Sequence, residues 1–234
     1  MKLKTLLISV FLLGTVSVAS AQNESYGKVY ASFNLAGVSL KGGGVVSSVD
    51  IAKATNGNDN VSMNGFNVGL LKGINLTKSA PLFLEIGGEV NYLAGSEQMV
   101  DFKMLNFQVP VNLTYRIPVC DGFAIAPYAG LNFKVNILGL VGSSGVNYSL
   151  FSDDDVALVE KYLGVKNYDP QTANRFQLGM NAGVNFVIAK KLCIGYRFQP
   201  DFIDYYKYDF IVDKYPASLS LATSSHSISI GYIF

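Results

Sequence analysis

The chain has few charged residues, and this scarcity limits the classes of protein to which it can belong. Charged side chains make up 15% of the 234 residues, whereas an average soluble domain carries about 25%. Hydrophobic residues make up 50%, which argues against a disordered chain and against an ordinary soluble surface. The formal net charge is only +1. Because no basic footprint is present, we expect no nucleic-acid partner.

Cysteines and long apolar runs are also scarce. Two cysteines, Cys120 and Cys193, are too few for a disulfide framework. We expect both at the same rim of the fold but on strands that are not neighbours, so a bond between them stays open. After residue 21, no apolar run approaches the roughly 18 residues of a spanning helix, which argues against a helical membrane protein.

The first residues, "MKLKTLLISVFLLGTVSVASAQ", have the layout of an export signal. Lys2 and Lys4 precede an apolar stretch, and Ala19-Ser20-Ala21 is a small-residue cleavage site. We therefore predict a signal peptide over 1–21, export through the Sec pathway, and one mature domain over 22–234. A retained membrane anchor is the alternative, but the apolar stretch is short for a span.

Apolar and small polar residues alternate along most of the mature chain. In "FQLGMNAGVNF" (176–186), every second residue is apolar and the others are Gln, Gly or Asn. A period of two over ten or more residues is typical of β-strands with one buried face. Eight such strands are predicted, at about 27–41, 62–76, 82–95, 103–117, 123–138, 175–188, 191–200 and 225–234.

The connections between these strands alternate in length. Short ones span 77–81, 118–122 and 189–191, 96–102 is intermediate, and long ones span 42–61, 139–174 and 201–224. Short periplasmic turns and long extracellular loops are typical of an outer-membrane up-and-down barrel. The Gly, Asn and Gln face fits a narrow interior, whereas a soluble carrier barrel would need a charged outer face. We therefore expect the apolar face, with its aromatic girdles, to contact lipid.

Several segments, in this order, resemble a known family. They are "FQVPVNLTYRI" (107–117), "IAPYAGLNF" (125–133), "FQLGMNAGVNF" (176–186), "LCIGYRF" (192–198) and "ISIGYIF" (228–234). The chain is similar to small OmpX- and OmpA-type barrels, and most of all to the PorT-like group of the outer membrane protein beta-barrel domain. The resemblance implies an all-β fold: an eight-stranded antiparallel up-and-down transmembrane barrel in the outer membrane of a Gram-negative bacterium, with lipid around it.

The same resemblance assigns a role to the last strand. In such barrels the final strand and its terminal aromatic residue are recognised by the barrel insertion machinery, which is the implied partner. That role falls on Ile228, Ile230, Tyr232 and Phe234. A proline also occurs in the family at the place of Pro110, so we expect a local bulge there rather than a break in the strand.

Five charged residues share the parity of the polar face: Glu85, Glu89, Arg116, Lys134 and Arg197. We expect Glu85 and Arg116 to be neighbours on adjacent strands, and Arg197 to reach across from the opposite wall. An eight-stranded barrel is just wide enough to be filled by side chains, so such charges must pair. This predicts a plugged, salt-bridged lumen. Separate charges solvated by trapped water are the alternative.

The long connections carry two further patterns. Within 139–174, "FSDDDVALVEKYLG" (151–164) predicts a short extracellular helix capped by Ser152 and Asp155. Calcium binding by Asp153, Asp154 and Asp155 is an alternative that stays open, but the triplet lacks calcium-loop spacing. The glycine-rich stretches lack the lysine of a phosphate loop, so no cofactor is expected. The aromatic, acidic stretch 201–215 predicts a strand that projects beyond the membrane; the alternative is an exposed edge that binds a partner.

Catalytic residues are hard to find. His226, the single histidine, has lipid-face parity, and the residue two positions on is Ile228 rather than the serine of lipid A deacylases. We therefore expect a non-enzymatic barrel, structural or adhesive, whose loops bind an unknown extracellular ligand. A lipid-modifying or proteolytic enzyme and an accessory barrel for assembly or secretion remain the alternatives.

Overall fold

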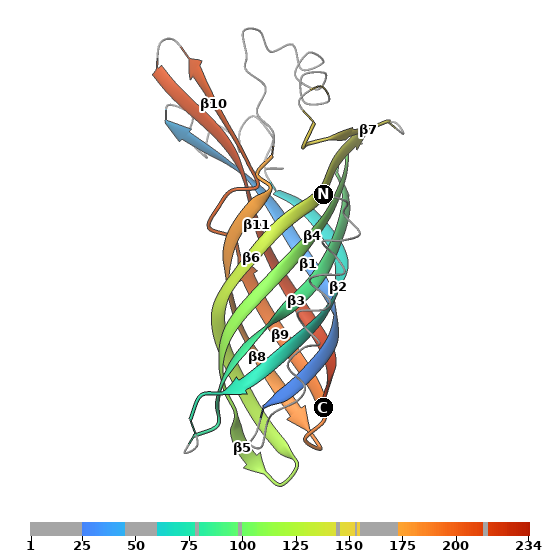
Figure 1. The fold of residues 1–234 in the computed structure, drawn as a ribbon. Helices are drawn as coiled ribbons and strands as arrows, with labels where there is room; N and C mark the ends of the chain where they lie inside the picture. The colour runs from blue at the N-terminus through green and yellow to red at the C-terminus, as the bar shows by residue number, and fades with distance from the viewer. Residues whose placement is uncertain are drawn as a thin grey trace, which may run out of the picture.

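The computed structural model describes residues 25–44, 60–77, 80–97, 100–143, 146–152, 154, 173–212 and 215–234. Within these residues, eight long antiparallel strands form a closed barrel (Figure 1). They are β1 (Tyr26–Gly44), β2 (Asn60–Asn75), β3 (Leu82–Glu97), β4 (Val100–Tyr115), β6 (Phe123–Ser143), β8 (Phe176–Ile188), β9 (Leu192–Pro200) and β11 (Tyr215–Ile233). Three short strands extend it: β5 (Ile117–Cys120), β7 (Val146–Ser149) and β10 (Tyr206–Val212). The predicted all-β, eight-stranded up-and-down barrel is confirmed.

The barrel closes where the first strand meets the last. β1 pairs with β11 from Lys28 opposite Ile233 to Gly44 opposite Ala217. Beyond β11, Phe234 completes the seam: Gly27 N donates to its carbonyl at 2.7 Å, and Phe234 N donates to the Gly27 carbonyl at 2.9 Å. The Phe234 ring lies over Gly27, where a β-carbon would collide with it. The last residue is therefore part of the barrel wall.

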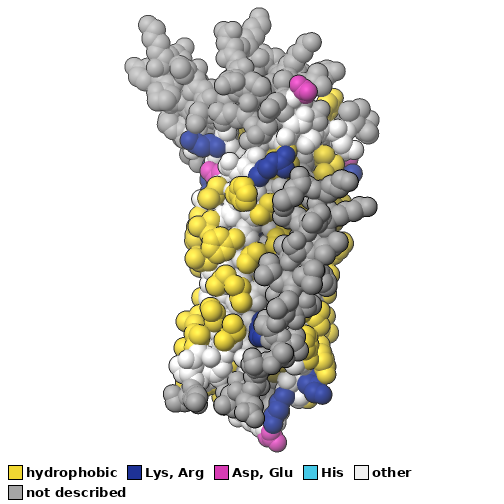
Figure 2. Space-filling model, in the orientation of Figure 1, with side chains coloured by type: hydrophobic (Ala, Val, Ile, Leu, Met, Phe, Trp, Pro, Cys, Tyr) yellow, Lys and Arg dark blue, Asp and Glu magenta, His cyan; other side chains and the backbone are white. Residues whose placement is uncertain are grey.

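The two faces of the wall differ as the alternation predicts. Large apolar side chains point outward, among them Phe33, Phe66, Ile228 and Phe234, each more than half exposed. The buried polar side chains of the lumen are mostly asparagine and glutamine, among them Asn67, Asn132 and Gln108. Figure 2 shows apolar side chains along the visible wall, with most lysine and arginine near its two ends. In the described part of the chain, no helix has the length and apolarity to span a membrane.

Some strands run beyond their predicted ends because they pair above the barrel. β10 forms a hairpin with the start of β11, from Tyr206 opposite Leu221 to Val212 opposite Tyr215, and this hairpin projects beyond the wall (Figure 1). The strand predicted within 201–215 is thus confirmed. At the opposite end, β5 pairs with the start of β6, so the predicted turn at 118–122 is the tip of a small hairpin.

The prediction of a bulge at Pro110 is wrong. Pro110 stays in register with Asn132 of β6 and its side chain is buried in the lumen. The β3–β4 register is also the same on both sides, Ile86 with Val111 and Glu89 with Gln108. Only the ladder opposite Gly87 and Gly88 is interrupted. The sheet therefore accommodates the missing N–H of Pro110 by leaving out two residue pairs of the β3–β4 ladder, without inserting an extra residue. The register shift that β4 does contain lies elsewhere, at Leu105/Asn106.

Other predictions fall on residues that the structure does not describe. The signal peptide, 1–21, lies wholly outside the described residues, as do most of the predicted helix, 151–164, and the tips of the long loops. Asp154 is the one described residue of the acidic triplet, and it is helical and exposed. These assignments stay predictions.

The β8–β9 turn contains two residues in an unfavourable conformation. Ala189 and Lys190 have φ angles of 50° and 62°, a left-handed region that costs most residues about 1–2 kcal/mol. The two-residue turns that suit this geometry prefer Asn-Gly. We therefore expect Ala189→Asn with Lys190→Gly to raise the free energy of unfolding by about 1–2 kcal/mol in urea titrations.

A matched control separates this effect from a general effect of glycine. Lys191 follows in the same turn and is not among the residues with positive φ. Lys191→Gly should therefore give no gain, since it only adds backbone freedom to the unfolded chain. An equal gain from both variants would contradict the account.

Candidate functional site

The interior of the barrel is arranged in layers. At the end where both described termini lie, an apolar layer consists of buried side chains from five strands: Tyr26, Phe83, Val187, Cys193 and Ile233. The structure leaves both cysteines free, with Cys193 buried in this layer and Cys120 exposed on β5. Cys120 and Cys193 therefore share a rim but not a bond.

Two ion pairs lie above this layer. Lys28 Nζ of β1 lies 3.1 Å from Glu85 Oε1 of β3, and Tyr26 donates its hydroxyl proton to the same oxygen. Arg197 of β9 donates through Nη1 to Glu89 Oε2 at 2.9 Å, and Tyr30 donates to this carboxylate too. All four ionic side chains are at least nine-tenths buried. Each carboxylate thus has one cation and one tyrosine as partners.

The structure brings Arg197 to Glu89 across the lumen, but it does not bring Arg116 to Glu85. That expected pairing is wrong, because Lys28 takes the Glu85 carboxylate. The Arg116 guanidinium instead lies 4.5 Å from the centre of the Tyr26 ring and 5.0 Å from that of Phe83. A guanidinium over an aromatic face is a favourable cation–π contact.

A layer of amides occupies the middle of the lumen. Gln108 is its hub: its Nε2 donates to Asn106, and its Oε1 accepts from Asn132 at 2.7 Å and from Gln199 at 2.8 Å. Asn34 donates to Asn91, and Asn181 to Asn112. Short amides bridge the walls here because each carries donors and an acceptor and so needs no charge.

A third ion pair lies nearer the extracellular end. Lys134 Nζ of β6 lies 2.7 Å from Asp201, which also accepts a hydrogen bond from Thr223. Gln177 donates to Thr223 and to the Ile203 carbonyl, each at 3.1 Å. Lys134 therefore has a partner that lies just past the end of β9.

The sequence reasoning missed Lys28 and Asp201. Lys28 shares its parity with Tyr26 and Tyr30, so the alternation of β1 could have revealed it. Asp201 gave no such signal, because it follows the last residue of β9 and was assigned to a loop. Alternation identifies which side chains face the lumen, but it does not give the height at which a side chain meets a partner.

Interior tyrosines are accommodated by glycines on neighbouring strands. A β-carbon on Gly69 would lie 2.6 Å from the Tyr30 ring, and one on Gly183 would lie 2.6 Å from the Tyr128 ring. We expect Gly69→Ala to lower the free energy of unfolding by about 1–3 kcal/mol, because the added methyl group displaces the Tyr30 ring and strains its hydrogen bond to Glu89. Gly37→Ala is the matched control, since nothing lies within 4 Å of a β-carbon there. Equal effects in urea titrations would contradict this.

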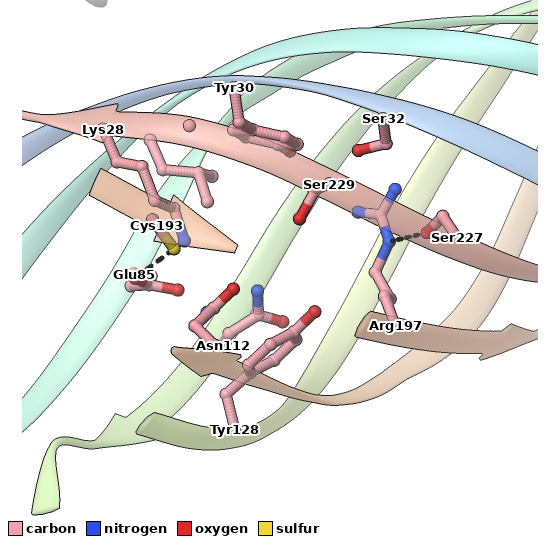
Figure 3. A pocket seen from close by; sticks show the side chains of 13 residues that line it. Lys28, Tyr30, Ser32, Glu85, Asn112, Tyr128, Cys193, Arg197, Ser227 and Ser229 are labelled. Atoms are coloured by element: carbon pink, nitrogen blue, oxygen red, sulfur yellow. Dashed lines mark hydrogen bonds and ion pairs between the residues drawn. The ribbon is translucent and has the colours of Figure 1, made fainter. Parts of the chain in front are cut away.

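A small cavity of about 20 Å³ remains between the two lower ion pairs, lined by Lys28, Glu85, Tyr128 and Arg197 among others (Figure 3). This volume is close to that of one water molecule. The trapped-water alternative thus has room for little solvent at this level, and the charges contact one another directly.

His226 lies on the outer surface. Its Nδ1 is 2.7 Å from the Tyr196 hydroxyl oxygen and its ring stacks on Phe198 with centroids 4.8 Å apart. Ser227 is buried on the opposite face of β11, where Arg197 Nε donates to it. Within the described ranges, no group of three or more His, Cys, Asp or Glu residues is placed to hold a metal ion.

The predicted insertion-signal residues share one face of the terminal strand. Ile228, Ile230, Tyr232 and Phe234 all point outward and are 46–65% exposed. Together they form an apolar ridge along β11, beside the seam with β1. Their recognition by the insertion machinery stays a prediction.

A closed barrel with an apolar outer wall and a polar interior is the class that fold and site define: an outer-membrane β-barrel. The family described as outer membrane protein beta-barrel domain matches residues 8–234. The chain belongs to this family, and its place is the outer membrane of Gram-negative bacteria. No curated protein matches the chain.

Solved structures of small outer-membrane proteins are similar to this chain in fold. Neisserial surface protein A (NspA) has a TM-score of 0.44 at 14% identity, covering 87% of this chain and 96% of its own. The attachment invasion locus protein Ail of Yersinia pestis, solved with the heparin analogue sucrose octasulfate, has a TM-score of 0.42 at 12% identity, with 89% and 99% covered. OprG of Pseudomonas aeruginosa has a TM-score of 0.44 at 12% identity, with 92% and 99% covered.

Proposed function

We propose that this protein is a non-conducting, non-enzymatic outer-membrane barrel that acts by binding through its extracellular surface. One observation carries the proposal: three buried ion pairs, Lys28–Glu85, Arg197–Glu89 and Lys134–Asp201, bridge the lumen at successive heights. An ion could pass only after these pairs separate. Since a buried charge that loses its partner is strongly destabilised, a steady open state is unfavourable.

The extracellular half supports a binding role. β1, β10 and β11 continue beyond the barrel as a projecting sheet, because β1 pairs with β11 as far as Gly44 and β10 pairs with β11 from Tyr206 (Figure 1). The opposite rim, by contrast, has short turns. A sheet that projects only from the extracellular rim of the barrel is suited to contacts outside the cell. The ligand is an extracellular one, and the outer-membrane lipid and the insertion machinery are the other partners.

Binding by intact cells tests this function. Cells that display the protein should retain glycans or proteins from an immobilised panel that cells without it do not. Replacing 207–220 by a short Asn-Gly turn should abolish that binding while the barrel stays heat-modifiable. A matched variant shortened at the other rim, between Pro118 and Gly122, should bind normally. Binding that survives the first change and is lost with the second would overturn the proposal.

A further inference from the structure

The barrel wall is lower above β8 and β9 than elsewhere. β8 begins at Phe176 and β9 ends at Pro200, whereas the neighbouring β6 continues to Ser143 and β11 begins at Tyr215. Three described segments, 149–151, 173–175 and 201–205, lie in the resulting gap. We refer to them together as the cap.

The cap completes the wall through single backbone hydrogen bonds. Leu150 N donates to the Gly139 carbonyl of β6, and Ala173 N donates to the Leu150 carbonyl. On the other side, Asn174 N donates to the Tyr205 carbonyl at 2.8 Å, and Tyr205 N donates to the Leu221 carbonyl of β11 at 2.7 Å. Further bonds hold the base of the cap, where Asn136 N donates to the Arg175 carbonyl, Asp201 N to the Thr223 carbonyl and Phe202 N to the Leu178 carbonyl. The cap is thus bonded to the wall without a regular strand ladder, and such irregular segments open locally more easily than a ladder does.

A packed apolar cluster, which we call the chamber, lies inside the cap. Four strands, β1 to β4, contribute buried side chains to it: Ala36, Val38, Met63, Leu93 and Met104. The cap supplies the opposite side with Ala173 and Tyr205. A cavity of about 20 Å³ already lies against Met63, Leu93 and Met104, with the amides of the middle layer below it. On its other side the same cavity is lined by the Lys134–Asp201 pair and by Thr223, Ser224 and Ser225 of β11. The chamber is thus apolar toward β1 to β4 and polar toward its floor and β11.

Tyr205 lies in this chamber with its hydroxyl group buried and, in the described part of the chain, unpaired. Its side chain is 2% exposed, its ring packs edge-on against Phe151, and its hydroxyl abuts Gly139. Among the described residues, that hydroxyl has no hydrogen-bond partner. Burying an unpaired hydroxyl is unfavourable. Burial also raises the pKa of this hydroxyl, with Arg175 acting in the opposite direction, so the group stays a neutral phenol.

We propose that the chamber is a binding site for a small apolar or aromatic molecule, and that Tyr205 is its displaceable internal occupant. The phenol ring marks the size and chemistry of what fits. The two methionines suit such a role because their unbranched side chains adapt to different shapes. This site is distinct from the projecting sheet, and the proposal rests on the proposed function only for the side from which the ligand enters.

Two substitutions should move the equilibrium in opposite directions. Tyr205→Phe keeps the ring and removes the unpaired hydroxyl, so the cap closes more tightly and the affinity for a probe should fall about threefold. Gly139→Ala places a methyl group where the Tyr205 hydroxyl lies, so the ring is expelled and the affinity should rise about tenfold. Gly37→Ala, which adds the same methyl group in open space, should bind as the wild type does.

The probe is fluorobenzene, followed by fluorine NMR on the full protein in lipid nanodiscs, with empty nanodiscs subtracted. Hydrogen exchange at the amides of Ala173, Asn174 and Tyr205 gives a second reading, and it should accelerate as the probe saturates. Any of three results would overturn the proposal. The two variants could shift the affinity for fluorobenzene in the same direction, or Gly139→Ala could bind no more probe than empty nanodiscs do. Hydrogen exchange in the cap could also be unchanged when the probe is saturating. Such a failure leaves binding at the projecting sheet unaffected, so the two proposals fail separately.

Discussion

Glu89→Gln is expected to lower the free energy of unfolding by about 3–5 kcal/mol, because it leaves the Arg197 guanidinium buried without its counter-charge. Arg197→Gln should cost a similar amount for the converse reason. The double variant should recover part of the loss, since neither charge is then left buried without its partner. Urea titrations of the folded barrel in lipid vesicles measure all three.

The chain contains a matched control for this cycle. Asp121 and Lys190 also form an ion pair, 3.7 Å apart, but their side chains are 100% and 81% exposed. Exposed pairs contribute little because water screens them. Asp121→Asn should therefore leave the unfolding curve unchanged. Strictly additive losses for Glu89 and Arg197 would show that their contact is not the source of the stability.

Deleting Phe234 should reduce the heat-modifiable barrel in outer membranes several-fold. Two features of this residue support that outcome: its backbone makes both hydrogen bonds that finish the β1–β11 seam, and its ring covers Gly27. The family resemblance adds a role in recognition. Phe234→Tyr keeps the ring and the backbone bonds, and it should insert normally.

Refolding the purified chain into lipid vesicles separates the two roles of Phe234. If the seam bonds matter, the deletion should also lower refolding without any insertion machinery. If only recognition matters, refolding should be normal and the defect should appear in cells alone. Normal yield in both settings would refute the prediction.

Much of the fold was predictable because a β-barrel wall imposes one simple rule on its sequence. Successive side chains face lipid and lumen in turn, so stretches such as 176–186 record the fold directly. The projecting strand β10 was also predicted, from the aromatic, acidic stretch 201–215, although its pairing with β11 was not. These features depend on local periodicity and not on which strands meet.

The contacts inside the lumen were less predictable because they depend on strand stagger. Glu85 was assigned to Arg116, an adjacent-strand neighbour, but Lys28 reaches it from β1. Glu89 and Arg197 lie 108 residues apart in sequence. Their contact could still be predicted, because the barrel is narrow enough for Arg197 to reach across it. Tyr205 and the rest of the cap have no periodicity at all, and so the apolar chamber was invisible in the sequence. At Pro110, the sheet tolerated a gap in the ladder that the sequence alone does not reveal.

Conductance across a planar bilayer tests the central claim most directly. The purified barrel, with insertion verified by heat modifiability, should give no steady current above that of the bare bilayer, since the three ion pairs and the amide layer occupy the lumen. A steady, porin-like conductance from the wild-type protein would contradict the account.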